Sequence, residues 1–147
     1  MKQIVCFLLL LLMLCCKTDD SIPDCSTVLC SAFNLNIKII DSTSSNYIIK
    51  NNITEDDINI KDTENKLIDL YIIFNSSSDY NGFFGFLATA SNNPIISIKN
   101  LEDIIVTYTI IPPQTNSCCD FGSIENLMVS NYQFKFNHEL NILTIYL

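Results

Sequence analysis

Several residue types are scarce in this chain of 147 residues, which has no tryptophan, a single histidine, three glycines and three alanines. Basic residues are also few: the chain has eight basic and 16 acidic residues, which gives a formal charge of −8. This balance argues against binding to nucleic acid, whose phosphates are contacted by clustered lysines and arginines. The chain has few alanines but 23 isoleucines, which argues against a helical bundle, since β-branched side chains lose rotamer freedom in helices. An apolar fraction of 48% excludes a disordered chain.

Motifs of catalysis and of cofactor binding are missing as well. Glycine occurs only at positions 82, 85 and 122, so there is no Gly-x-Ser-x-Gly motif and no glycine-rich phosphate loop. The lone histidine, His138, stands beside Glu139 in a predicted turn, which indicates a polar surface residue. The acidic stretch from Glu55 to Glu64 lacks the spacing of an EF-hand calcium loop. We therefore expect no enzyme, no cofactor and no metal site.

The first residues have the pattern of an export signal. Lys2 precedes an unbroken apolar run of 13 residues from Ile4 to Cys16, and the polar segment Lys17-Thr18-Asp19-Asp20 follows at once. A helix that spans a bilayer needs about 20 apolar residues, whereas a run of about 7–15 behind a positive charge is typical of a secretory signal. The run ends in cysteine and so resembles the signal of bacterial lipoproteins. This resemblance implies a signal peptide at 1–15, a lipidated Cys16 with a tether over 16–24, and one domain over 25–147.

The tether extends the resemblance to a narrower group. Cys-Lys-Thr-Asp-Asp resembles the acidic export signal of surface lipoproteins of the Bacteroidota type, and the later pattern Asp24-Cys25-Ser-Thr-Val-Leu-Cys30 is similar to small lipoproteins of the same bacteria. The resemblance implies acyl chains that hold the protein in the outer membrane at the cell surface; the periplasmic face and secretion are the alternatives. Asp20-Ser21-Ile22 and Asp41-Ser42-Thr43 are similar to O-glycosylation triplets of such bacteria. The resemblance brings no activity with it.

The number of cysteines favours a lipoprotein. Cleavage leaves five, and lipidation of Cys16 would leave four at positions 25, 30, 118 and 119, an even number in an oxidising compartment. A bond between the adjacent Cys118 and Cys119 would close a strained ring, so we expect these two to pair with Cys25 and Cys30. The sequence leaves the order of pairing open. A zinc site is disfavoured, because neither pair has CxxC-like spacing.

Alternation of apolar and polar residues predicts an all-β domain. It is strictest in Phe33–Ile39, where every second residue is polar. Asn81-Gly82 predicts a tight hairpin turn, and Pro112-Pro113 predicts a strand end. Some eight or nine strands predict an antiparallel two-sheet sandwich, immunoglobulin-like or transthyretin-like, with a lipocalin-like β-barrel as the alternative. The other predicted strands are Tyr47–Lys50, Asp57–Ile60, Leu67–Phe74, Phe83–Ala90, Ile95–Ile98, Ile104–Ile111, Met128–Phe136 and Ile142–Leu147.

The function expected from these features is a non-enzymatic binding, adhesion or structural module of the cell envelope. Its partner is the membrane, through the lipid, and its protein or glycan ligand is left open. Tyr80, in the predicted hairpin loop, is the best candidate for an exposed contact, because the neighbouring phenylalanines lie on strands and are expected to pack in the core. Two alternatives remain: an accessory subunit or enzyme of a polysaccharide-processing system, and a small inhibitor or immunity-type lipoprotein.

Overall fold

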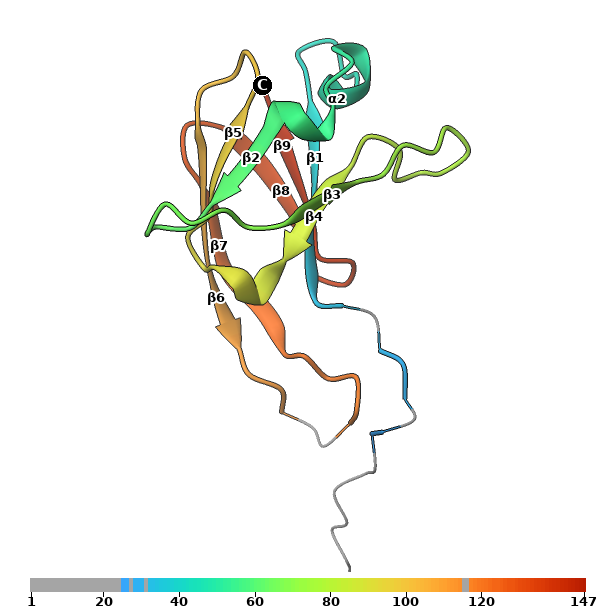
Figure 1. Ribbon diagram of the computed structural model, residues 1–147, viewed down its shortest axis with the longest axis vertical. Coiled ribbons are helices and arrows are strands. Elements are labelled where there is room, and N and C mark those ends of the chain that lie inside the picture. Colours follow the sequence, from blue (N-terminus) through green and yellow to red (C-terminus); the bar gives the residue numbers. More distant parts are fainter. Residues whose placement is uncertain (1–24, 27, 31, 115–116) are drawn as a thin grey trace, which may run out of the picture.

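The domain consists of two β-sheets packed face to face (Figure 1). The computed structural model describes residues 25–26, 28–30, 32–114 and 117–147, so the predicted signal peptide, Cys16, the tether over 16–24 and the triplet Asp20-Ser21-Ile22 lie outside the described residues. One sheet has the strand order β3-β4-β1-β9-β8 and the other the order β2-β5-β6-β7. The strands are β1 Asn34–Ile40, β2 Ile58–Lys61, β3 Leu70–Ile72, β4 Phe84–Leu87, β5 Ile95–Ile98, β6 Ile104–Ile111, β7 Ser123–Val129, β8 Gln133–Asn137 and β9 Ile142–Tyr146.

These sheets confirm the predicted sandwich. In the described ranges the two sheets stay separate and do not close into one, so the lipocalin-like alternative is wrong. Helical structure is confined there to α2 Tyr47–Lys50 and the single 3-10 turns η2 Glu55–Asp57 and η3 Ala88–Ala90. No helix among the described residues has the length and apolar character needed to cross a bilayer.

The core lies between the inner faces of the two sheets. Strand β1 alternates as predicted, with Leu35, Ile37 and Ile39 fully buried and the residues between them partly exposed. Isoleucine dominates the other sheet's contribution as well, because its branched side chain packs well on a pleated surface. The buried residues of the remaining strands are Ile58, Ile60, Phe84, Phe86, Ile96, Ile98, Ile104, Val106, Tyr108, Ile124, Leu127, Leu143 and Ile145.

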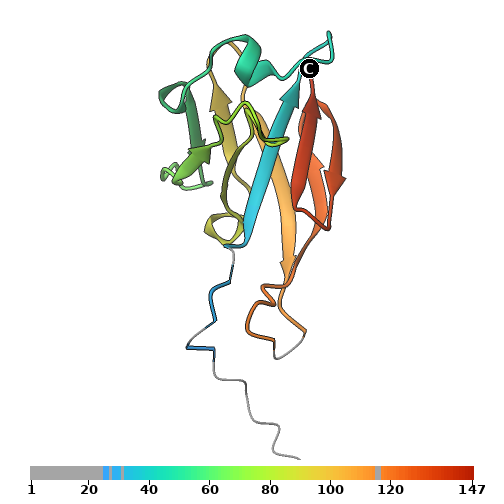
Figure 2. The same cartoon turned by 90° about the vertical axis from the view of Figure 1, so that its right-hand side faces the viewer.

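One strand pair departs from the antiparallel expectation. Strands β1 and β9 run parallel, with Lys38 opposite Thr144 and Ile40 opposite Tyr146. Figure 2 shows them side by side with their arrowheads at the same end. The first and last strands therefore meet in the middle of the five-stranded sheet, where β4 flanks β1 and β8 flanks β9.

Asparagine occupies most of the positions with a positive φ angle among the described residues. Seven described residues other than glycine have a positive φ angle, and all but Ser44 are asparagines. Asparagine tolerates this conformation because its short polar side chain can hydrogen-bond to the local backbone. Backbone conformation thus accounts for six of the 17 asparagines. These six are Asn52, Asn65, Asn100, Asn126, Asn131 and Asn141.

The predicted strand Tyr47–Lys50 is wrong, because this segment forms the helical turn α2. The side chain of Asn46 determines the difference. Its Oδ1 accepts hydrogen bonds from the backbone N–H groups of Ile48 and Ile49, at 3.0 and 3.3 Å, as an N-cap residue does. Ile48 is buried on the core side of this turn.

The predicted strand Met128–Phe136 is also wrong, because it spans two strands in different sheets. Strand β7 ends at Val129, Asn131 turns the chain with a φ of 64°, and β8 begins at Gln133. Within β7, Met128 is 63% exposed and Leu127 is buried. Strand β7 was missed over most of its length because an irregularity near Asn126 breaks the period of two between Ile124 and Leu127.

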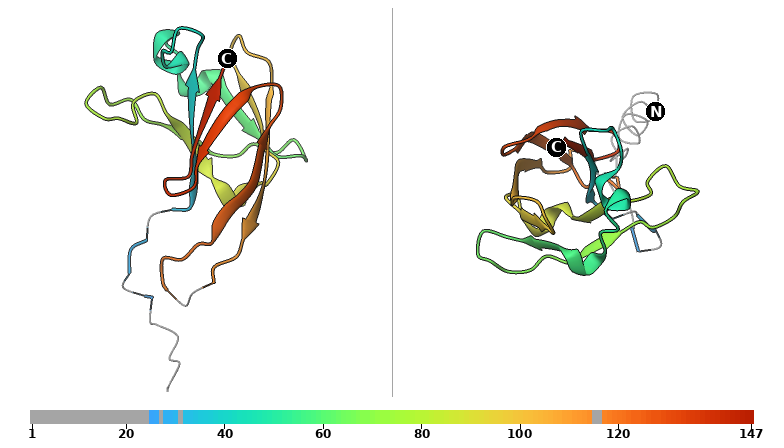
Figure 3. Two further views of the ribbon diagram at one scale, coloured as in Figure 1. Left: turned by 180° about the vertical axis from the view of Figure 1, so that it is seen from behind. Right: turned by 90° about the horizontal axis from the view of Figure 1, so that it is seen from above.

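The predicted strand Leu67–Phe74 shrinks to the three residues of β3. Its first part belongs to the other sheet, since the N–H of Ile68 donates to the carbonyl of Ile60 at 2.8 Å. The Asn81-Gly82 turn is not the predicted two-residue hairpin. Gly82 has a positive φ of 73°, but its N–H bonds to the carbonyl of Ile73, so that residues 74–81 form a longer loop. This loop projects from the side of the sandwich in the view from above (Figure 3).

Two disulfides tie the start of the domain to the β6–β7 loop. Cys25 bonds to Cys118 and Cys30 to Cys119, which confirms the predicted cross-pairing and supplies its order. Both bonds lie at the end of the sandwich that we call the disulfide pole, formed by the described residues 25–26, 28–30, 32–33, 111–114 and 117–123. Helix α2 and the C-terminus lie at the opposite end (Figure 1).

Candidate functional site

The outward side of the five-stranded sheet, which we call the β1 face, gathers polar and aromatic side chains from all five strands. Side chains alternate along a strand, and directly paired residues on neighbouring strands share a face. Because Leu35 and Ile37 point into the core, the intervening Asn36 and Lys38 point outward, with their partners on the adjacent strands. The β1 face comprises Asn34, Asn36, Lys38, Ile40, Tyr71, Phe83, Gly85, Leu87, Gln133, Lys135, Asn137, Ile142, Thr144 and Tyr146.

The Tyr71 ring lies against this face, in the space left by a neighbouring residue that has no side chain. Gly85, between Tyr71 on β3 and Asn36 on β1, has no side chain, and a Cβ there would lie 2.6 Å from the Tyr71 hydroxyl. The hydroxyl reaches across Gly85 and donates to Asn36 Oδ1 at 2.5 Å. Partial burial raises the pKa of Tyr71 above its usual value, because the charged phenolate would lose contact with water. The hydrogen bond fixes the ring and the amide together before any ligand arrives.

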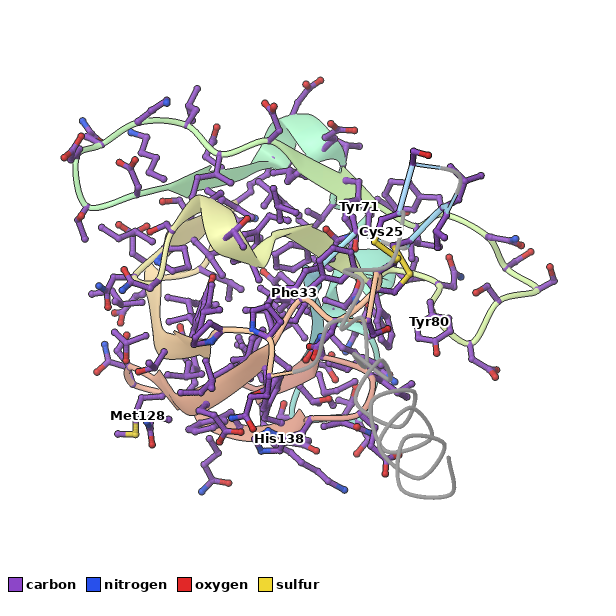
Figure 4. All side chains as sticks on the ribbon, turned by 90° about the horizontal axis from the view of Figure 1, so that it is seen from below. Cys25, Phe33, Tyr71, Tyr80, Met128 and His138 are labelled. Carbon is purple, nitrogen blue, oxygen red and sulfur yellow. A yellow bond between two sulfur atoms is a disulfide. The ribbon has the colours of Figure 1, made fainter. Side chains whose placement is uncertain are left out.

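A second aromatic group borders the face beside Lys38. The Lys38 ammonium lies 5.3 Å from the centre of the Phe83 ring, within the range of a cation–π contact. Tyr80 packs edge-on against the same ring, at 5.4 Å between centroids. Tyr80 comes from the projecting loop and is 39% exposed, and its role as a contact residue stays a prediction. Figure 4 shows Tyr80 on the opposite side of the molecule from Met128.

A shallow groove of about 290 Å³, which we call the β1 groove, crosses β1, β9 and β8 on this face. Its floor includes Thr144, and Lys38 and Lys135 stand on either side, each directly paired with Thr144 in the strand register. Tyr146 borders the groove and is 42% exposed. The groove thus offers amine, hydroxyl and amide groups beside an aromatic ring, on a rigid sheet. The remaining lining residues are Ile40, Asn137 and Ile142.

A larger cleft of about 500 Å³ lies at the disulfide pole, against the Cys30–Cys119 bond. It contains His138 and Glu139, both exposed, together with Phe33 and Phe121, whose rings stack 6.3 Å apart. His138 packs edge-on against Phe136 at 4.7 Å. Among the hydrogen bonds of the described residues, none joins His138 to a carboxylate, so the cleft shows no oriented acid–base pair.

The acidic stretch serves local structure. The Asp57 carboxylate receives hydrogen bonds from the backbone and hydroxyl of Thr54 and pairs with Lys99 at 2.9 Å. The ion pair, followed by these hydrogen bonds, lowers the pKa of Asp57. Asp62 accepts from the N–H groups of Glu64 and Lys66 and so closes its own turn. In the described part of the chain, no group of three His, Cys, Asp or Glu side chains is placed to hold a metal ion.

Most residues of the β1 face were not singled out from the sequence. The alternation in Phe33–Ile39 did assign Asn34, Asn36 and Lys38 to the outer side of a strand. The local sequence pattern does not predict that β1 pairs with β9 and β9 with β8, and this pairing brings the side chains together. The turn triplet Asp41-Ser42-Thr43 lies in the exposed turn after β1, where Asp41 pairs with Lys50.

Comparisons with known proteins identify no relative. No model of a protein family matches the chain, and neither the curated proteins nor the solved structures contain a match.

Proposed function

We propose that this protein is a non-enzymatic carbohydrate-binding module, anchored in the outer membrane by acyl chains on Cys16 and exposed at the cell surface. The single observation that carries the binding role is the fixed array on the β1 face, where Tyr71, Gly85 and Asn36 form one row and Lys38, Thr144 and Lys135 the next. The anchor rests on the pattern of residues 1–20.

The chemistry of the β1 face suits a sugar chain better than a protein. A sugar ring has hydroxyl groups at its edge and apolar C–H groups on its faces, so it needs hydrogen-bonding side chains beside aromatic rings. The β1 face provides amides, amines and hydroxyls together with the rings of Tyr71 and Tyr146. The centre of a protein–protein interface is typically apolar and poor in charge. The outer side of the other sheet fits that description better, since Ile105 and Met128 are both exposed there.

The position of the disulfide pole is compatible with display at the surface. Cys25 and Cys30, which follow the proposed tether, are bonded to the β6–β7 loop at this pole. Anchoring at Cys16 would therefore place this pole toward the membrane and let the strands of the β1 face run outward. The groove would then remain open to chains that surround the cell.

Binding is tested by retardation of the protein in native gels that contain dextran, mannan or polygalacturonate. We expect Tyr71→Ala and Asn36→Ala each to weaken binding roughly tenfold, since each removes a ligand contact and frees its partner from a preformed hydrogen bond. The matched control is Asn59→Ala, an exposed asparagine on β2 of the other sheet. Unchanged retardation of both variants in every gel, or no retardation of the unmodified protein, would contradict the proposed function.

The anchor is tested separately with Cys16→Ser. Without the thiol no thioether to diacylglycerol can form, so we expect loss of labelled fatty acid from the protein and its release from the membrane fraction. The variant should still bind the polysaccharide that the unmodified protein binds, because the β1 face is untouched. Unchanged fatty-acid labelling and membrane partitioning would rule out the anchor at this residue.

A further inference from the structure

We propose that the ligand is an acidic carbohydrate, whose anionic groups bind between Lys38 and Lys135. This inference rests on the carbohydrate-binding role proposed above and specifies its substrate class. The observation that carries it is the placement of two lysines on either side of one groove, on strands that are both neighbours of β9.

The distribution of positive charge singles out these two lysines. All eight basic residues are lysines, and six of them lie in the described ranges. Two of the six form ion pairs, Lys50 with Asp41 and Lys99 with Asp57. The other four belong to no ion pair within the described residues, and of these only Lys38 and Lys135 line the β1 groove, whereas Lys61 and Lys66 lie outside it. A protein of net charge −8 thus presents two unneutralised cations in its candidate binding groove.

The geometry suits one anionic group held by both lysines. Lys38 and Lys135 each pair with Thr144, so their backbones are separated by two strand spacings, about 10 Å. Flexible side chains can bring both ammonium groups to a carboxylate or sulfate placed above Thr144, whose hydroxyl offers a further donor. Phe83 contacts the Lys38 ammonium and limits its range of positions on one side. Hydrogen bonds between charged partners are about twice as strong as neutral ones, which favours an anion over a neutral sugar here.

The negative net charge of the protein implies that binding of an acidic polysaccharide would depend on a specific site. A surface with a net charge of −8 repels a polyanion at long range, so nonspecific attraction is not expected. Any acidic polysaccharide that binds must therefore be held by a local group of cations. The β1 groove is the place where the described lysines provide one.

The test uses two matched pairs of polysaccharides in native gels with the full-length protein in detergent. Polygalacturonate is compared with its methyl ester, in which each carboxylate is replaced by an uncharged ester on the same polymer backbone, and dextran sulfate is compared with dextran. The two acidic polymers distinguish a carboxylate from a sulfate as the bound group. We expect at least one acidic polymer to bind at least tenfold more tightly than its neutral counterpart.

The lysines are tested by Lys38→Gln and Lys135→Gln. Each should reduce the affinity for the acidic polymer by about tenfold and the pair by about a hundredfold, while binding of the neutral polymer stays the same. The matched control is the pair Lys61→Gln and Lys66→Gln, which removes the same charge outside the groove and should have little effect. Circular dichroism of each variant verifies that the sheets are intact.

The outcomes separate this inference from the proposed function. Equal binding of acidic and neutral polymers, still weakened by Tyr71→Ala, would overturn the acidic ligand and leave the carbohydrate-binding role standing. A preference for acidic polymers that persists in the double glutamine variant would also overturn the site. If no polymer of either pair binds, the acidic ligand is overturned, and the carbohydrate-binding role fails with it if mannan does not bind either.

Discussion

Loss of both disulfides should bring the domain close to unfolding. We expect the variant with serine at positions 25, 30, 118 and 119 to lose about 7 kcal/mol of its free energy of unfolding. Either bond closes a long loop, with a sequence separation of 93 for Cys25–Cys118 and 89 for Cys30–Cys119. The chain-entropy treatment assigns about 4.6 kcal/mol to the first such loop, and about 2.5 kcal/mol to the second bond, which closes only the small ring of residues 25–30 and 118–119. Domains of this kind typically have only about 5–15 kcal/mol in total.

The same treatment predicts that the two bonds are not additive. Removing either one alone leaves the long loop closed by the other, so each single-bond variant should lose only about 2.5 kcal/mol. The loss for both bonds should therefore exceed the sum of the two separate losses by about 2 kcal/mol. Urea unfolding in a Cys16→Ser background measures all three variants without the lipid. Strict additivity, or a single-bond loss as large as the loss of both, would contradict the loop-closure account.

Truncation of Phe84 should have the next largest effect. Phe84 is fully buried, pairs with Ile37 on one side and Ile72 on the other, and fills the inner face of the five-stranded sheet. Phe84→Ala would leave a cavity, and we expect a loss of about 3–5 kcal/mol in the free energy of unfolding. Urea unfolding monitored by circular dichroism measures this loss.

Strand β4 also supplies the matched control for this experiment. Leu87 lies on the same strand but is 46% exposed on the β1 face, so Leu87→Ala should cost less than about 1 kcal/mol. Similar losses for the two variants would mean that Phe84 does not occupy the core as the structure places it.

The parts of the fold that follow from local pattern were predictable from the sequence. The alternation of Phe33–Ile39 gave both the strand and its buried side, because every second side chain of a half-buried strand must avoid water. The cysteine pairing was narrowed to two options, since a ring across the Cys118–Cys119 peptide bond is strained. The hairpin at Asn137–Glu139 was predicted as well, and Asn137 Oδ1 does accept hydrogen bonds from the Glu139 and Leu140 backbone.

Other parts of the fold could not be predicted, because the local sequence pattern was misleading or because the structure depends on pairing with a distant segment. Tyr47–Lys50 has the composition of a strand, and only the capping bonds of Asn46 make it helical. Strand β7 was hidden by the irregularity near Asn126, which places Ile124 and Leu127 on the same buried side despite their odd spacing. Tyr80 was singled out as an exposed loop residue, whereas Thr144 was not singled out, since its position between Lys38 and Lys135 depends on the pairing of β9 with β1 and β8.

The central position of β1 beside β9 has a consequence for the order in which the protein is made and folded. A ribosome releases β1 long before β9 exists, so until β9 has emerged β1 can pair only with β4, and β8 lacks its neighbour in the sheet. Contacts between such distant segments form slowly. The five-stranded sheet should therefore stay open to proteases during synthesis and become resistant only after β9 has inserted between β1 and β8.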